Sequence, residues 1–123
     1  MLSGAKVVAF VPTRDAAKAR SFYEGVLGLR LVSEDAFALV FDCAGTMLRV
    51  VNVAEFEPFP FTVLGWDVPD APMAARGLRA KGVAFDRYEG MGQDELGIWT
   101  SPAGARVAWF RDPDGNVLSI TEF

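Results

Sequence analysis

The residues that could carry out chemistry are few in this sequence. No histidine occurs among the 123 residues, which removes the commonest general base and the commonest imidazole ligand of metal ions. The single cysteine, Cys43, has neither a histidine to activate it nor a second cysteine to pair with, and we interpret it as an inert thiol. Two carboxylates, Asp67 and Glu122, are the candidate bases. No acid–base pair is evident, so the sequence favours binding over catalysis.

Arg49 is the most informative polar side chain. It lies in an apolar segment over 47–53, where a guanidinium cannot lose its charge and needs an acceptor. Two interpretations stay open. Arg49 forms a salt bridge within the protein, with Asp67 or Glu122 as its partner, or it binds a carboxylate or phenolate of a ligand.

Three tryptophans form a second group of candidates. We expect Trp66 to pack beneath a helix, whereas Trp99 and Trp109 either stack on a planar ligand or pack in the core of a sheet. The segment 89–96 carries Met91 between two glycines. It is either a mobile lid or an ordinary solvated loop.

Composition excludes several classes of function. A net charge of −4, a pI near 4.7 and the lack of a basic cluster exclude nucleic acid as a partner. No apolar run approaches the roughly 20 residues that span a bilayer, so we expect no membrane contact. A single cysteine indicates a reducing compartment, which favours the cytoplasm. A mass of 13.3 kDa with 51% apolar residues is that of one globular domain.

An internal repeat predicts the elements that position these residues. The segment Val11–Ala17 aligns with Trp66–Pro72, and Asp42–Val50 aligns without gaps with Asp112–Ile120. In the first pair, an apolar run ends at an aspartate that can cap a helix. In the second pair, two strands flank a turn from aspartate to glycine.

The repeat predicts two helices, over 16–27 and 71–81, that begin after Asp15 and Asp70 and end at Gly28 and Gly82. The predicted strands cover 6–11, 29–33, 36–41, 47–53, 61–67, 83–88, 97–100, 106–111 and 117–122. We therefore predict an α+β fold with two tandem βαβββ modules, over 1–53 and 61–123. An extended, proline-containing linker over 54–60 joins them. The modules should form a curved mixed sheet around a cavity.

This duplicated pattern resembles the vicinal oxygen chelate superfamily, which includes glyoxalase I, bleomycin-resistance proteins and extradiol dioxygenases. The resemblance covers nearly the whole chain. It is carried by Val11–Asp15 leading to Ser21–Leu29, and by Phe110–Asn116 near the C-terminus.

The resemblance also locates the metal site of the metal-dependent members. In them, four side chains, typically His or Glu, hold a divalent ion from the first and last strand of each module. The matching residues here are Val8, Arg49, Val63 and Ser119. None of these four, nor their immediate neighbours, is a normal ligand for a hard divalent cation. We therefore predict no metal and no other cofactor, and with them no glyoxalase or dioxygenase chemistry.

Alternation of side chains along each strand then predicts the cavity wall. The positions that share the parity of the matching residues are mostly apolar, which suits a small hydrophobic ligand with one or two polar groups. The alternative is that these side chains, or a partner subunit, fill the concavity. The predicted ligand-binding residues are Phe10, Met47, Arg49, Val63, Asp67, Trp99, Trp109, Ser119 and Thr121.

The resemblance implies a member of the metal-free, bleomycin-resistance-like branch. Such a protein sequesters a small, partly aromatic or anionic molecule as a homodimer and performs no chemistry. One alternative is a metal-independent isomerase, lyase or hydrolase with Asp67 or Glu122 as its base. Another is a structural interaction module whose cavity is filled.

Overall fold

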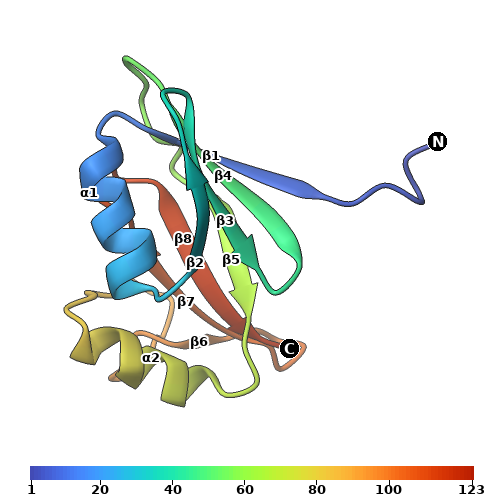
Figure 1. Cartoon of the computed structure of the whole chain (residues 1–123). Coiled ribbons are helices and arrows are strands. Elements are labelled where there is room, and N and C mark those ends of the chain that lie inside the picture. Colours follow the sequence, from blue (N-terminus) through green and yellow to red (C-terminus); the bar gives the residue numbers. More distant parts are fainter. The chain divides into compact units, whose positions relative to one another are not determined.

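The computed structural model describes residues 1–123, and the chain forms two compact units, Met1–Glu57 and Pro58–Phe123. Each unit contains one four-stranded mixed sheet with helical segments against it (Figure 1). The order of elements in both units is βαβββ, so the predicted α+β fold of two such modules is confirmed. None of the helices has the length and hydropathy needed to cross a membrane.

The first module has the sheet order β1-β4-β3-β2. Strand β1 runs parallel to β4, and the other two pairings are antiparallel. Its elements are β1 (Val8–Thr13), α1 (Ala16–Arg20), the π-helix η1 (Ser21–Val26), β2 (Arg30–Glu34), β3 (Ala38–Cys43) and β4 (Thr46–Asn52).

The second module repeats this topology with the order β5-β8-β7-β6. Strand β5 is parallel to β8, and β8, β7 and β6 pair antiparallel. Its elements are β5 (Thr62–Asp67), α2 (Ala71–Ala80), β6 (Trp99–Thr100), β7 (Arg106–Arg111) and β8 (Val117–Glu122).

Aspartate caps start both helices, as predicted. The Asp15 carboxylate accepts a hydrogen bond from the Lys18 N–H, and Asp70 accepts one from the Met73 N–H. Gly28 and Gly82, with φ of 72° and 94°, adopt the left-handed conformation that ends each helix. The first helix differs from the prediction in its second half, which is wound as a π-helix over Ser21–Val26.

Each sheet has one face against its helix and one face without a helix. In the first module, Tyr23 of η1 lies 6.0 Å from Phe41, and both are fully buried. In the second, Glu122 of β8 binds the start of α2, so the residues that alternate with it, such as Ile120, share the helix face. We call the opposite face of each sheet its open face.

One predicted strand is absent. Residues 83–88 alternate as a strand does, but only Phe85 forms a bridge, to Phe110. Beyond this bridge, the N–H of Tyr88 donates its hydrogen bond to the side chain of Gln93 and not to a neighbouring strand. The side chain of Gln93 thus makes the hydrogen bonds that a paired strand would otherwise make with this segment.

The predicted alignment of Asp42–Val50 with Asp112–Ile120, which has no gap, is wrong by one residue for the strands β3 and β7. Four residues, 43–46, separate the paired Asp42 and Met47, whereas five residues, 112–116, separate the paired Arg111 and Val117. The longer turn is closed by the Asp112 carboxylate, which accepts hydrogen bonds from the N–H groups of Asp114 and Asn116. Phe41 is therefore equivalent to Phe110, and Val40 to Trp109.

Candidate functional site

The strand registers place the predicted site residues on the open faces. In the first module, Phe10 pairs with Arg49, which pairs with Val40 of β3. Met47 lies two residues before Arg49 and shares this face. Phe10, Arg49 and Met47 are thus on one surface, as the parity of the sequence indicated.

The first open face is apolar and exposed. Phe10 is 62% exposed and Met47 is 42% exposed. A shallow hollow of about 300 Å³ lies at one end of this face. Its lining combines apolar side chains with charges at the rim: Lys6, Val7, Val8, Arg30, Val32, Val40, Phe41, Asp42, Gly45 and Met47.

Arg49 is half-buried on this face, and no residue of the first module forms an ion pair with it. Its electrostatic neighbour is Asp35. Hydrogen bonds from the N–H groups of Phe37 and Ala38, together with the attraction of Arg49, lower the pKa of the Asp35 carboxyl. Arg49 therefore retains its donors for another acceptor.

The second open face carries the other predicted residues except Val63. Ser119 of β8 lies between Gly65 of β5 and Trp109 of β7, and Thr121 pairs with Asp67. Trp99 of β6 pairs with Val107, two residues before Trp109, and so faces the same side. The indole rings of Trp99 and Trp109 lie 6.0 Å apart with planes at 33°.

The two residues in the same row as Trp109, Ser119 and Gly65, have small side chains or none. A Cβ atom added at Gly65 would come within 2.7 Å of the Ser119 Oγ, so the space above this pair of strands is closed to any side chain at Gly65 unless Ser119 moves. The ring of Trp109 consequently stands next to two of the smallest residues on the face.

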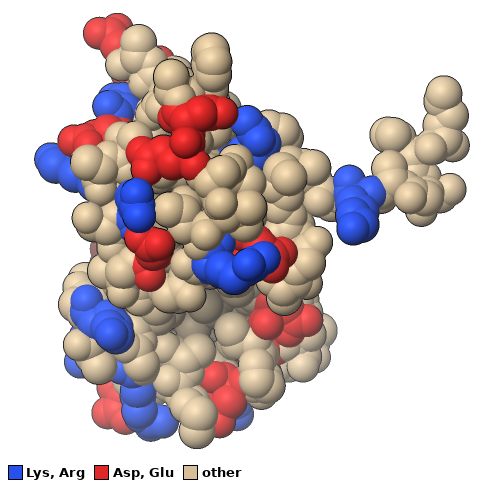
Figure 2. Space-filling view, viewed as in Figure 1, with Lys and Arg blue, Asp and Glu red and all other residues tan.

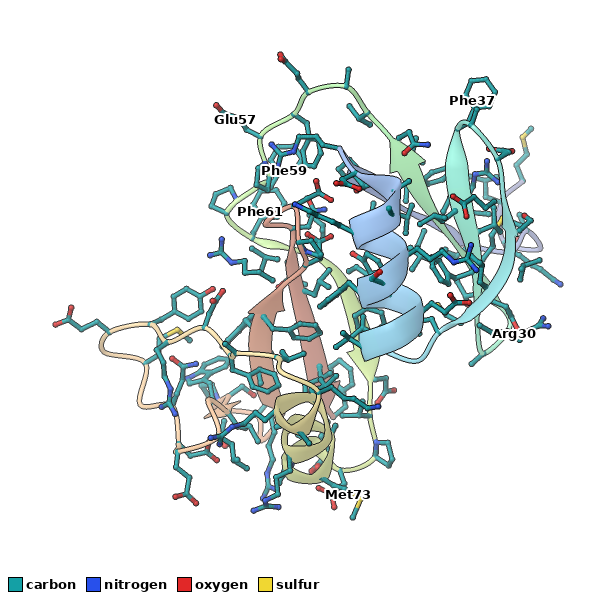
Figure 3. All side chains as sticks on the ribbon, turned by 60° about the vertical axis from the view of Figure 1, so that its left-hand side comes forward. Arg30, Phe37, Glu57, Phe59, Phe61 and Met73 are labelled. Carbon is teal, nitrogen blue, oxygen red and sulfur yellow. The ribbon has the colours of Figure 1, made fainter.

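A pocket of about 270 Å³ opens beside Trp109. The Tyr88 ring meets the Trp109 ring edge to face, with centroids 5.6 Å apart and planes at 84°. Phe61 also lines the pocket and stacks on Phe59 at 5.0 Å; both are labelled in Figure 3. We call this the aromatic pocket; it is lined by Pro60, Phe61, Thr62, Tyr88, Met91, Trp109 and Val117.

The segment 89–96 is held in place by hydrogen bonds along its length. The Arg87 guanidinium donates to the carbonyls of Asp94 and Glu95 at 2.6 and 2.7 Å. The Asp94 carboxylate accepts from the N–H groups of Leu96 and Ile98. Of this segment, Met91 lines the pocket and is half-buried.

The two candidate bases differ in how they are engaged. Glu122 lies on the helix face, accepts a hydrogen bond of 2.8 Å from the Ala71 N–H and lies 4.0 Å from Arg106. Its carboxylate thus caps α2, and the expectation that it could act from the cavity is corrected. Asp67 is exposed on the open face beside Thr121. It has no hydrogen bond or ion pair within the second module.

An ion pair lies next to Tyr88, one of the aromatic residues of the pocket. Asp86 forms an ion pair of 2.7 Å with Arg111, and this hydrogen bond raises the pKa of the Arg111 guanidinium. The Tyr88 hydroxyl lies 3.5 Å from the same Asp86 carboxylate. On the face of the molecule drawn in Figure 2, basic and acidic side chains are interspersed without a continuous basic area.

The four positions that match the metal ligands of relatives do not fit a divalent ion. Val8 and Val63 offer no donor atom, Arg49 is a cation, and Ser119 offers one hydroxyl. No group of three or more His, Cys, Asp or Glu side chains in the structure could hold a metal ion. We therefore derive no chemistry through a metal for this chain.

Two details of the pocket were not predicted from the sequence. Strand β5 is irregular between Thr62 and Leu64, so Thr62 and not Val63 lines the pocket beside Val117. Tyr88 was not among the expected ligand-binding residues. The sequence before Tyr88 looks like a continuing strand and does not show that the chain turns there. The turn depends on the side chain of Gln93, five residues later.

Comparison with known proteins agrees with this geometry. Residues 6–120 match the family model described as the Glyoxalase/Bleomycin resistance protein/Dioxygenase superfamily. The chain belongs to that superfamily. The comparison with curated proteins gave no match.

Solved structures share the fold. A bleomycin resistance determinant encoded on the transposon Tn5 is 20% identical over 95% of this chain and 96% of its own, with a TM-score of 0.75. The lactoylglutathione lyase from Agrobacterium tumefaciens is 17% identical over 97% and 93% of the two chains, with a TM-score of 0.74. A superfamily member from Sphaerobacter thermophilus is 22% identical over the full length of both chains, with a TM-score of 0.76. At these identities the likeness establishes the fold and leaves the activity open.

Proposed function

We propose that this chain binds a small, partly aromatic molecule and does not convert it. The observation that carries the proposal is the arrangement of Tyr88, Trp99 and Trp109 on one open face, beside a pocket of about 270 Å³. Aromatic walls with few polar groups are the usual lining of a small-molecule site.

The ring geometry favours a flat ligand. The indole of Trp109 contacts a perpendicular tyrosine and a tilted tryptophan, so a planar molecule can stack on one ring while its edge meets another. Each such contact contributes about 0.5–1.5 kcal/mol beyond the burial of area. The likeness to a bleomycin resistance determinant is consistent with binding, and the likeness to a lactoylglutathione lyase makes catalysis the competing proposal.

A pair of probes with the same carbon skeleton and hydroxyl position, one flat and aromatic and one saturated, tests this proposal. We expect 2-naphthol to bind the protein in a calorimetric titration and its saturated analogue, 2-decalol, to bind at least fivefold more weakly, because only the first can stack. The 2-naphthol should be recovered chemically unchanged. Equal binding of both probes, or binding of neither, would contradict the proposal.

Arg49 supports a separate proposal, that the first open face holds an anionic group. It is a half-buried cation on an apolar surface, without an ion-pair partner in its own module. We expect benzoate to bind the wild type more tightly than it binds the variant Arg49→Met, while both proteins bind 2-naphthol equally well. Equal affinity of the two proteins for benzoate would show that Arg49 does not hold a carboxylate.

The competing proposal is a metal-independent isomerase, lyase or hydrolase. With Glu122 engaged in capping α2, Asp67 is its single candidate base. A turnover that is lost in Asp67→Asn while 2-naphthol binding is retained would favour this enzyme over a binding protein.

The family resemblance also leads us to propose a homodimer in the cytoplasm. The exposed apolar residues Val8, Phe10, Val32 and Met47 of the first open face are the kind of surface that a second subunit buries. Sedimentation velocity should give twice the mass of 13.3 kDa. A single monomeric species at micromolar concentration would contradict the homodimer.

A further inference from the structure

Gln93 uses its side-chain amide on the backbone around it. Its Oε1 accepts a hydrogen bond of 2.7 Å from the Tyr88 N–H, and its Nε2 donates to the carbonyls of Asp86 and Gly97, both at 2.9 Å. The side chain is half-buried, and its nitrogen has two protons to donate, so both donors are satisfied. No other side chain of the segment 86–97 makes three such bonds in the structure.

The bonds to Asp86 and Tyr88 have the pattern of a parallel β-ladder. In such a ladder, one residue donates to the carbonyl before its neighbour and accepts from the N–H after it. The Gln93 amide does the same on either side of Arg87. The Asp86 N–H donates to the Trp109 carbonyl at 2.8 Å. Segment 86–88 is therefore bound both by strand β7 and by the side chain of Gln93.

This arrangement sets the two pocket residues that come from the loop. The N–H of Tyr88 is the group that Gln93 binds, and the N–H of Met91 donates to the Tyr88 carbonyl at 3.3 Å. The Tyr88 ring, fixed in this way at its backbone, reaches Trp109. Both side chains line the aromatic pocket, whereas Gln93 does not touch it.

We propose that Gln93 is the positioning residue of the aromatic pocket. It holds Tyr88 and Met91 in their places before a ligand arrives, so binding requires no further ordering of the loop. The inference rests on the proposed function, because it assigns Gln93 an effect on ligand affinity at the same site. It also predicts that the segment 89–96 keeps Met91 at the pocket and does not act as a lid.

The variant Gln93→Ala tests the inference directly. It removes all three hydrogen bonds and leaves every pocket side chain in the sequence. We expect the Kd for 2-naphthol to rise about tenfold and the near-ultraviolet circular dichroism of the Tyr88–Trp109 pair to weaken. The far-ultraviolet spectrum should stay that of the wild type. As a matched control we expect no change in Glu89→Gln, which alters a loop side chain that forms no hydrogen bond in the structure.

The variant Gln93→Glu adds a readout that a purely structural role would not give. The introduced carboxylate can accept from the Tyr88 N–H but cannot donate to the carbonyls of Asp86 and Gly97. These two oxygens disfavour the charged form and so raise the pKa of the introduced carboxyl. Once protonated it donates again, so affinity for 2-naphthol, which is neutral throughout, should recover as the pH falls from 8 to 5. The wild type and Gln93→Ala should show no such recovery.

The outcomes separate this inference from the proposed function. A near-ultraviolet spectrum in Gln93→Ala identical to that of the wild type would overturn the positioning role, and so would an affinity of Gln93→Glu that does not change with pH. If 2-naphthol fails to bind the wild type, the proposed function falls, and the spectrum of Gln93→Ala still decides whether Gln93 positions Tyr88. If Gln93→Ala does not fold, the pH profile of Gln93→Glu decides.

Discussion

The open faces of the two modules carry different side chains at equivalent positions. Across β1, β4 and β3 of the first module the central row is Phe10, Arg49 and Val40, and across β5, β8 and β7 of the second it is Gly65, Ser119 and Trp109. The large ring is thus on an edge strand in one module and on an inner strand in the other. On the edge strand the ring is 62% exposed, while on the inner strand it stands beside small residues and a pocket.

The helix faces show no such divergence. Phe41 and Phe110 are equivalent, and both are completely buried. A core position must fill a fixed volume, whereas an open-face position is constrained only by its neighbours on that face. We infer that the shared frame of the two modules supplies stability and that the difference between their open faces supplies the binding surface.

The largest effect is expected where the two modules agree. Phe41→Ala and Phe110→Ala should each lower the free energy of unfolding by about 3–5 kcal/mol, because each removes a fully buried aromatic side chain and leaves a cavity. Denaturant titration measures both. A cost below about 1 kcal/mol in one variant only would show that the two helix faces are not equivalent.

The next effect separates the open faces. Trp109→Ala should raise the Kd for 2-naphthol at least tenfold, about 1.4 kcal/mol, because the central ring of the pocket is lost. Val40→Ala, the matched variant of the first module, should leave the Kd unchanged. Calorimetry on both variants makes the comparison, and a similar loss in Val40→Ala would place the ligand elsewhere.

A smaller effect tests the space beside Trp109. Gly65→Ala should cost about 1 kcal/mol of stability, since the added Cβ comes within 2.7 Å of the Ser119 Oγ and turns that hydroxyl away. The double variant Gly65→Ala, Ser119→Ala should recover most of the loss. Phe10→Ala, at the equivalent exposed position, should change stability by less than about 0.5 kcal/mol. No recovery in the double variant would contradict the close packing of this pair.

The smallest effect concerns the charge beside Arg49. The pKa of Asp35 is lowered in the folded protein, so its ionised form contributes stability that is present above the unfolded pKa of about 3.9 and is lost as the pH falls through the lower folded value. Asp35→Asn should therefore lose less stability than the wild type on acidification below about pH 4. Urea titrations between pH 2 and 7 measure the two slopes. Parallel slopes would mean that Asp35 has no such interaction.

Much of the fold followed from local signals in the sequence. Asp15 and Asp70 are followed by helices because their carboxylates satisfy backbone N–H groups at short range. The turns at 43–46 and 112–116 each contain a glycine, Gly45 or Gly115, at a positive φ that glycine favours. The parity of the strands then placed Arg49 and Ser119 on the open faces.

The parts that the sequence did not predict depend on single residues at a distance. The extra residue in the turn at 112–116 shifts β7 by one position, and no alternation within the strand reveals it. The end of the segment at Tyr88 is set by Gln93, whose side chain takes the place of a strand. The irregular pairing of β5 exchanges Thr62 for Val63 at the pocket.

The three tryptophans allow the central claim, that the open face of the second module is the ligand-binding surface, to be tested in one spectrum. Trp99 and Trp109 lie on that face, whereas Trp66 stacks on Phe110 on the helix face. In a ¹⁵N-resolved titration with 2-naphthol, the account predicts that the indole N–H signals of Trp99 and Trp109 shift together and saturate while that of Trp66 stays in place. A saturating shift of Trp66 alone, or shifts confined to backbone signals of residues 1–57, would contradict it.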